Sequence, residues 1–254
     1  MDSSAWKYID ELAGRIKRIL LVFIISLLVF LALPAPNPFD LKTSSIFFYD
    51  TLIFWLIRTM EVAYLPQGAK IFSISITSPL FSVIQMALYL ALAITIPYAF
   101  KEIYAFISPA LYKREKKVIR KYLLPFGILY VTGAIYTTIF ILPLTFRALI
   151  FLYEPLNIEL LINLNDFINM VVLMVILGGV LFSLPTLILP LIEAGILKVR
   201  TLSKNRVLIY LIVAFIAGLI SPDPTFLSVI PLLIPVYVLY EGTIIIGKKL
   251  ENKQ

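Results

Sequence analysis

The amino-acid sequence predicts an all-α integral membrane protein with six transmembrane helices. Two observations lead to this fold class. Hydrophobic residues make up 61% of the 254 residues and charged residues only 15%, whereas a soluble domain is about half apolar and about a quarter charged. The apolar residues are also gathered into six long runs with few charges, as a hydrocarbon layer about 30 Å thick requires.

Prolines and charges set the boundaries of these runs. The first run ends at the proline-rich residues 34–38, which cannot continue a helix. Pro79 stands in the first turn of the second run, where a helix tolerates proline. The third run carries Pro125 near its start and Pro143 near its end. We expect the six spans at residues 16–33, 80–100, 122–146, 167–192, 207–220 and 226–246.

The last two runs predict short helices. Residues 207–220 would extend over roughly 21 Å as a helix, less than the thickness of the hydrocarbon layer. A Ser-Pro-Asp-Pro turn at residues 221–224 follows at once, and Pro231 and Pro235 interrupt the sixth run. We expect a short fifth and sixth helix that fall short of the far surface or thin the bilayer. The alternative is an ordinary mismatch between helix length and bilayer thickness, which neighbouring helices compensate.

Lysine and arginine are distributed unevenly between the loops. All but four of the 22 lie in the amino-terminal segment, the second-to-third loop, the fourth-to-fifth loop or the carboxyl tail. The other four are Lys42, Arg58, Lys70 and Arg147. Basic residues favour the cytoplasmic side of a membrane, so we expect both termini in the cytoplasm. An even number of spans requires the same arrangement.

The first outer loop, residues 37–78, is long and has an apolar middle. Asp50, Arg58 and Glu61 disfavour a seventh span there. We expect a helix lying across the outer interface, with Trp55 at the depth of the lipid headgroups. Acidic residues precede the first run, unlike the basic region of a signal peptide, so we expect that run to be retained and not cleaved.

Composition excludes most chemistry. The chain has no cysteine and no histidine, which removes disulfides, thiol nucleophiles, Cys/His zinc sites and histidine acid–base catalysis. We expect no cofactor, no metal and no enzymatic activity. The net charge of +7 sits in short clusters between apolar runs, where it faces lipid headgroups, so we expect no nucleic-acid partner.

The loop after the second run carries a long ordered motif. Residues 104–117 read YAFISPALYKREKK, in which an aromatic-Ala-Phe step leads to Pro, Leu and Tyr and then to one acidic residue among basic ones. This motif resembles the signature loop of the TatC family, the signal-peptide receptor subunit of the twin-arginine protein translocase. Ser78-Pro79, the turn at residues 221–224, and residues 234–237 with Glu241 also resemble that family. The resemblance covers residues from about 8 to 250, in a single domain of residues 1–254.

The resemblance implies a function. A member of this family receives twin-arginine signal peptides of folded proteins at the cytoplasmic face of the cell membrane. It assembles with single-span TatA/TatB-type proteins, self-associates in a larger complex and supports export driven by the proton-motive force. The six helices are then expected in a curved, open bundle.

The resemblance also assigns a signal-peptide site. A receptor for two adjacent arginines needs carboxylates, because a guanidinium pairs with them through two parallel hydrogen bonds. The matching positions are Glu11, Phe106 and Glu115. Each also has a local alternative role: a helical salt bridge from Glu11 to Arg15, plain packing for Phe106, and relief of a basic cluster for Glu115.

Polar residues within the spans form a second candidate group. Glu241 lies about 10 Å inside the cytoplasmic end of the sixth run, at a depth where a carboxylate is usually functional or paired. Gln85 and Ser183 are weaker candidates for the same partner-helix or intramembrane polar site. Ser183 stands where the family commonly has a glutamate. Asp223 lies in the outer turn, where we expect it to cap or turn the chain.

Two other membrane-protein classes compete with this interpretation. A small-solute transporter of another family predicts ionisable residues converging at mid-membrane from several spans, and such residues are nearly absent here. No internal repeat supports an inverted-repeat transporter. An intramembrane protease needs a Ser/His pair or two mid-span aspartates, and the chain has neither.

Overall fold

The computed structural model describes residues 3–34, 51–65, 70–73, 75–107, 113–153, 161–220 and 229–251. Within these ranges the chain is almost entirely helical, as expected. It divides into two compact units. The first consists of residues 1–102 and 150–172, and the second of residues 103–149 and 173–254.

The first unit contains two complete helices, two short strands and parts of three further helices. The complete elements are α1 (Ser3–Ala32), α2 (Leu52–Tyr64), β1 (Lys70–Phe72) and β2 (Leu161–Asn163), and the partial ones are most of α3 (Ser78–Ile107), the end of α5 (Leu142–Tyr153) and the beginning of α6 (Leu164–Glu193). α1 ends just before Pro34, where the sequence predicted its end. It begins well before residue 16, because the segment that precedes the apolar run is itself helical.

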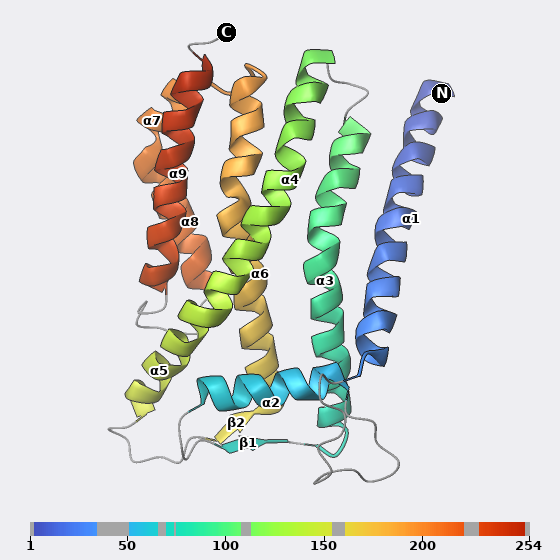
Figure 1. The fold of residues 1–254 in the computed structure, drawn as a ribbon, viewed down its shortest axis with the longest axis vertical. Helices are drawn as coiled ribbons and strands as arrows, with labels where there is room; N and C mark the ends of the chain where they lie inside the picture. The colour runs from blue at the N-terminus through green and yellow to red at the C-terminus, as the bar shows by residue number, and fades with distance from the viewer. Residues whose placement is uncertain are drawn as a thin grey trace. The chain divides into compact units, whose positions relative to one another are not determined.

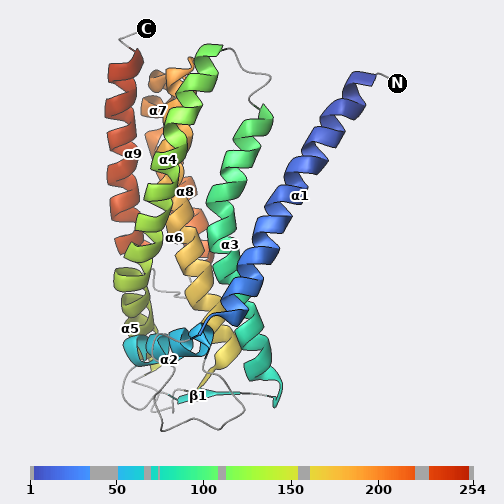
Figure 2. The ribbon, with the colours of Figure 1, turned by 45° about the vertical axis from the view of Figure 1, so that its right-hand side comes forward.

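α2 lies crosswise at the foot of α1 (Figures 1 and 2). The amide of Leu52 donates to the carbonyl of Leu33 at 2.9 Å, so the chain leaves α1 and starts α2 at adjacent points. Ile53 and Ile57 are buried, whereas Phe54 and Trp55 are exposed. This spacing puts Ile53 and Ile57 on a covered face of α2, and leaves the aromatic side chains of Phe54 and Trp55 open. The predicted loop helix is therefore present.

The strands β1 and β2 pair in parallel and were not predicted. Their register joins Lys70 to Leu161 and Phe72 to Asn163. Each strand has three residues and no alternating apolar pattern long enough to be recognised. The pairing joins the segment before α3 to the start of α6 in the first unit.

The second unit begins its long helical segment with α4 (Lys113–Tyr136), the π-helix η2 (Thr137–Ile141) and α5 (Leu142–Tyr153). Pro143 accounts for the change of winding. Its ring would clash with the carbonyl of residue 139 in a regular α-helix, and it has no amide to donate. A π-helical turn placed before the proline relieves that clash and lets the helix continue.

The rest of this unit is α6, α7 (Val199–Lys204), α8 (Arg206–Ile220) and α9 (Val229–Glu251). α8 and α9 lie side by side (Figures 1 and 2). With 15 residues α8 confirms the short fifth helix. The expectation of a short, interrupted sixth helix is wrong, because α9 has 23 residues and continues through Pro235. Pro231 stands in its first turn, where no backbone hydrogen bond is lost.

Four helices among the described residues are long and apolar enough to cross a membrane, which confirms an integral membrane protein. They are Ser78–Phe106, Arg120–Phe151, Leu164–Glu193 and Val229–Glu251. α8 is a shorter apolar helix. α1 differs from the four because Arg15, Lys17 and Arg18 lie within its last eighteen residues, leaving residues 19–32 uncharged.

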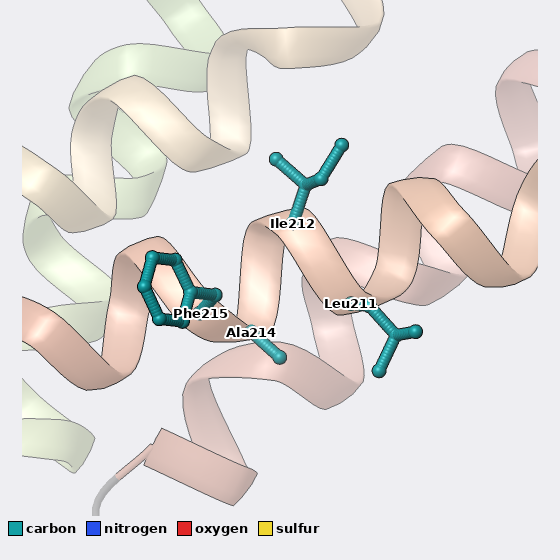
Figure 3. Close-up of a pocket in the computed structure, with 4 residues that line it drawn as sticks. All are labelled: Leu211, Ile212, Ala214 and Phe215. Atoms are coloured by element: carbon teal, nitrogen blue, oxygen red, sulfur yellow. The ribbon is translucent and has the colours of Figure 1, made fainter.

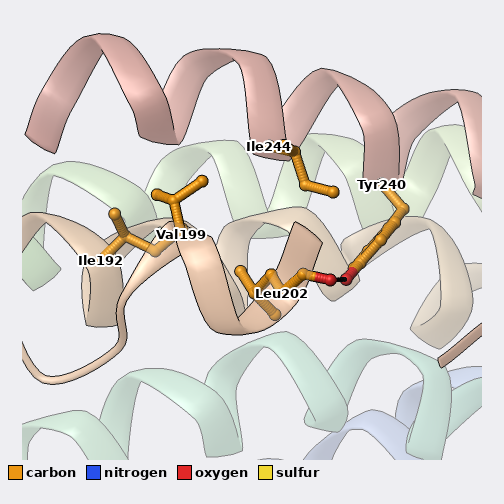
Figure 4. Packing of buried hydrophobic residues seen from close by; sticks show 5 residues of the cluster. All are labelled: Ile192, Val199, Leu202, Tyr240 and Ile244. Carbon is orange, nitrogen blue, oxygen red and sulfur yellow. Dashed lines mark hydrogen bonds between the residues drawn. The ribbon is translucent and has the colours of Figure 1, made fainter. Parts of the chain in front are cut away.

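Small residues allow close helix packing inside the second unit. The carbonyl of Gly178 and the side chain of Phe182 lie against Gly133, so α4 and α6 approach closely there. A buried cluster joins α6, α7 and α9 (Figure 4). In this cluster the hydroxyl of Tyr240 donates to the carbonyl of Leu202 at 3.3 Å, so a buried polar group is satisfied as well as packed. Its five members are Ile192, Val199, Leu202, Tyr240 and Ile244.

Candidate functional site

Glu11 and Arg15 pair on α1, in the first unit. They stand four residues apart, so their side chains lie on the same face of the helix. Oε1 of Glu11 accepts hydrogen bonds from Nη2 of Arg15 at 2.6 Å and from Nε at 3.1 Å. The local salt bridge considered from the sequence is therefore present. It also shows that this carboxylate can hold a guanidinium group through two donors at once.

Glu102 joins this pair from α3 and was missed in the sequence. Its carboxylate accepts from Nη1 of Arg15 at 3.2 Å and from the hydroxyl of Tyr98 at 3.1 Å, and Nη1 of Arg18 lies 3.4 Å away. Only 5% of Glu102 is exposed. A lone acidic residue four positions after Tyr98, at the end of an apolar run, is the signal that could have revealed it.

We call these residues, Glu11, Arg15, Arg18, Tyr98 and Glu102, the α1–α3 ion cluster. Its two carboxylates and two guanidinium groups balance in charge, which is how a buried carboxylate is usually stabilised. The hydrogen bonds that Arg15 donates to Glu11, and then the negative charge of Glu11, raise the pKa of the Arg15 guanidinium above its ordinary value, and Glu102 adds a smaller effect in the same direction. The guanidinium therefore stays charged, and the cluster is a site where arginine is held by carboxylates.

The other two predicted signal-site residues lie in the second unit. Phe106 is half-buried in the last turn of α3. Glu115 belongs to the first turn of α4, and its side chain lies outside the described part of the chain.

Glu241 of α9 is tied to α8. Its Oε1 accepts a hydrogen bond from the hydroxyl of Tyr210 and lies 3.5 Å from Nη1 of Arg206. The hydroxyl of Tyr237 donates to the backbone carbonyl of Tyr210 at 3.0 Å, and the two rings stand 4.4 Å apart. The predicted intramembrane carboxylate is thus paired, and its partners link the two helices of the carboxyl-terminal hairpin.

The outward side of α8 is apolar. Leu211, Ile212, Ala214 and Phe215 line an open hollow of about 500 Å³, and Figure 3 shows Ile212 and Leu211 pointing to different sides of the helix. A more enclosed apolar cavity of about 400 Å³ lies between α6, α8 and α9. Both surfaces suit hydrocarbon or apolar side chains and offer no site for a polar ligand.

Gln85 belongs to an amide cluster of the first unit. Its Nε2 donates to Oδ1 of Asn169, which also accepts from the hydroxyl of Tyr89 at 2.7 Å. One turn away, the hydroxyl of Ser82 donates to Oδ1 of Asn165 at 2.5 Å. These bonds join the beginning of α3 to the beginning of α6, so Gln85 has a structural partner.

Ser183 is fully buried in α6 and is satisfied within its own helix. Its hydroxyl donates to the carbonyl of Val180 at 2.7 Å, as serine often does in membrane helices.

Asp223 lies outside the described residues. Over the ranges that the structure describes, no group of three or more His, Cys, Asp or Glu side chains could hold a metal ion.

Comparison with known proteins identifies relatives of the chain. Residues 7–235 match the family model described as Sec-independent protein translocase protein (TatC). The protein TatCy of Bacillus subtilis is 27% identical over 245 residues, which cover 96% of this chain and 90% of the relative. TatC of Rickettsia prowazekii is 31% identical over 209 residues, covering 81% of this chain and 83% of the relative.

Solved structures show the same fold. A crystal structure of the twin-arginine translocase receptor TatC superimposes with a TM-score of 0.75 at 24% sequence identity, covering 96% of this chain and 99% of the other. A second crystal structure of that receptor, in DDM, gives a TM-score of 0.73 at 23% identity, covering 94% and 99%. The chain therefore shares the fold of these two structures.

Proposed function

Because the chain belongs to the TatC family of Sec-independent protein translocase proteins, we propose that it is the subunit that binds twin-arginine signal peptides. The family is a non-enzymatic membrane component of a protein translocase and works in a complex. The proposal names what this chain contributes to that complex. It receives folded proteins through the paired arginines of their signals.

One observation carries the proposal: the carboxylate of Glu11 holds a guanidinium through two donors, the nearer at 2.6 Å. A carboxylate that binds one arginine in this way has the chemistry to bind another. Each such charge-assisted hydrogen bond contributes about 1.5–3 kcal/mol. Lysine has no planar fork, so a receptor built on carboxylates distinguishes arginine from lysine although both are cations.

Glu11 and Glu115 receive the two guanidinium groups in this proposal, and Phe106 contacts the apolar residues that follow them. Support for Glu115 and Phe106 comes from the ordered motif at residues 104–117, which lies within the family match. The signal peptide is the ligand of this site, and the folded protein attached to it is the substrate that is exported.

In the proposed topology the protein lies in the plasma membrane as one domain with six spans. Both of its termini face the cytoplasm. α1 crosses through its uncharged residues 19–32, and Arg15, Lys17 and Arg18 mark its cytoplasmic end. α2 lies in the outer interface, where its exposed Phe54 and Trp55 suit headgroup depth. The short helix α8, together with α1 and the four long apolar helices, brings the number of spans to six.

Partner proteins of the TatA/TatB type bind through their single apolar helix in this proposal, and the assembly moves substrates with the proton-motive force. The apolar side of α8 offers exposed side chains to such a helix. Glu241 stands at one end of that helix pair, and its pairing with Tyr210 keeps α8 in position. Gln85 and Ser183 are assigned, with Glu241, to the partner-helix or intramembrane polar site, and Asp223 is assigned to the outer turn. The chain also associates with further copies of itself.

Peptide binding tests the receptor function. Purified protein in detergent is titrated with a fluorescent signal peptide carrying Arg-Arg, and with the same peptide carrying Lys-Lys, while anisotropy is recorded. We expect the Lys-Lys peptide to bind at least about tenfold more weakly. Glu115→Gln and Glu11→Gln should each weaken Arg-Arg binding by about tenfold or more.

Asp10→Asn is the matched control, because Asp10 is an exposed carboxylate next to Glu11 on the same helix. It removes the same charge and should leave the affinity within about twofold, as expected of an exposed charge. Equal affinity for Arg-Arg and Lys-Lys, with no loss in the Glu115 and Glu11 variants, would refute the receptor proposal.

A further inference from the structure

We propose that Glu102 is a third carboxylate of the arginine-binding site, and that Arg18 is the chain's own occupant of it, which an incoming signal arginine displaces. The inference rests on the proposed function and adds a specificity residue and a competitor to it. It starts from an arrangement already present in the structure, a buried carboxylate that holds guanidinium groups of the same chain.

The burial of Glu102 requires that some cation always faces it. Only 7% of its side chain is exposed, and an ionised carboxylate removed from water without a partner is strongly unfavourable. Its present donors are Arg15, Arg18 and the hydroxyl of Tyr98. A ligand can therefore reach Glu102 only by bringing an equivalent donor, and a guanidinium is the group that fits.

The two arginines differ in how firmly they are held. Arg15 has only 14% of its side chain exposed and binds both Glu11 and Glu102. Arg18 has 57% exposed, and its Nη1 lies 3.4–3.5 Å from the Glu102 oxygens. Exposed ion pairs contribute little to stability. Arg15 is thus the fixed part of the site, and Arg18 is the part that can leave with little loss of stability.

Exchange of Arg18 for a ligand arginine keeps the cluster balanced. The number of charges and of hydrogen bonds on Glu102 stays the same. The Arg18 side chain, which is already more than half exposed, becomes fully exposed to water when it leaves. Arg15 meanwhile continues to hold Glu11 and Glu102 together. The affinity of the receptor is therefore set by competition between two guanidinium groups.

This competition predicts effects of opposite sign. Arg18→Gln removes the competitor and should tighten binding of the Arg-Arg peptide by about threefold to tenfold, whereas Glu102→Gln should weaken it by about tenfold or more. If Glu102 and Arg18 only anchored α1, both substitutions would weaken binding together. The sign of the Arg18→Gln effect therefore separates a competitor from a structural contact.

Lys17→Gln is the control for Arg18→Gln. Lys17 is the neighbouring exposed cation on α1, and its replacement removes the same charge without vacating Glu102. A gain in affinity for Arg18→Gln no larger than that for Lys17→Gln would overturn the inference. Far-UV circular dichroism and a thermal melt in detergent monitor folding of every variant. If Glu102→Gln does not fold, the comparison of Arg18→Gln with Lys17→Gln decides alone.

A double-mutant cycle adds a second test. In the Glu102→Gln background the gain from Arg18→Gln should disappear, because the competitor no longer occupies a carboxylate. A gain that persists there would contradict the inference. The failures can be told apart: equal binding of Arg-Arg and Lys-Lys by the unmodified protein refutes the proposed function. Selective binding with no gain in Arg18→Gln refutes only this inference.

Discussion

Gly178 of α6 has no room for a side chain. A Cβ placed there would lie 1.8 Å from Oγ1 of Thr137 and 2.9 Å from its Cβ. Thr137 is fully buried in the π-helix η2, so it has no open space into which to move. We expect Gly178→Ala to lower the free energy of unfolding by about 1–3 kcal/mol through overpacking, measured as a lower Tm in detergent.

Gly14→Ala on α1 is the control for that substitution. No atom lies within 4 Å of a Cβ placed at Gly14, and alanine is a better helix former than glycine by about 1 kcal/mol. This variant should melt at the same temperature as the unmodified protein or higher. Adding Thr137→Ala to Gly178→Ala should recover part of the loss. A Gly178→Ala melt that matches Gly14→Ala would show that the two helices have space there.

At the scale of elements, the short helix α8 depends on side-chain links to α9. The hydroxyl of Tyr210 donates to Glu241, and its removal leaves that carboxylate with Arg206 as its partner among the described residues. We expect Tyr210→Phe to destabilise the protein by roughly 1 kcal/mol. Thermal melting in detergent measures it, with Tyr8→Phe as control, because Tyr8 is exposed on α1. Equal melting temperatures for the two variants would show that the link does not stabilise the hairpin.

The sequence predicted the elements better than their ends and irregularities. Hydrophobic runs and Pro34 located the end of α1, and the short apolar run located α8. Pro235 was interpreted as an interruption, whereas α9 continues through it, because neighbouring groups in a membrane bundle satisfy the freed carbonyl. The π-helix before Pro143 and the strand pair β1–β2 have no periodic pattern that a single sequence displays.

The candidate site was only partly predictable for a related reason. Glu11 was identified by resemblance, and its spacing to Arg15 predicted the observed pair. Glu102 was missed because it lies 84 positions from Arg18 and 87 from Arg15, and no local pattern relates them. A contact between α1 and α3 depends on how the chain folds back. Only the structure reveals that a buried carboxylate joins the two arginines.

For the whole molecule, the distribution of charge makes a testable statement about sidedness. The chain has no cysteine, so single cysteines can be introduced without background. If both termini lie in the cytoplasm, as the charge distribution predicts, Thr59→Cys in α2 should react with a membrane-impermeant maleimide in intact cells. Gly14→Cys and Glu251→Cys should react only after the membrane is permeabilised. All three positions are exposed, so burial within the protein does not explain a difference in labelling.

Labelling of Gly14→Cys or Glu251→Cys in intact cells would contradict the topology, and each outcome bears on the site. The α1–α3 ion cluster lies beside Gly14, in the same first part of α1. A signal peptide is presented from the cytoplasm before export, so the cluster can receive it only if this end of α1 faces the cytoplasm. If Gly14→Cys reacted from outside, neither Glu11 nor Glu102 could meet a precursor, and the binding proposals would fail together with the topology.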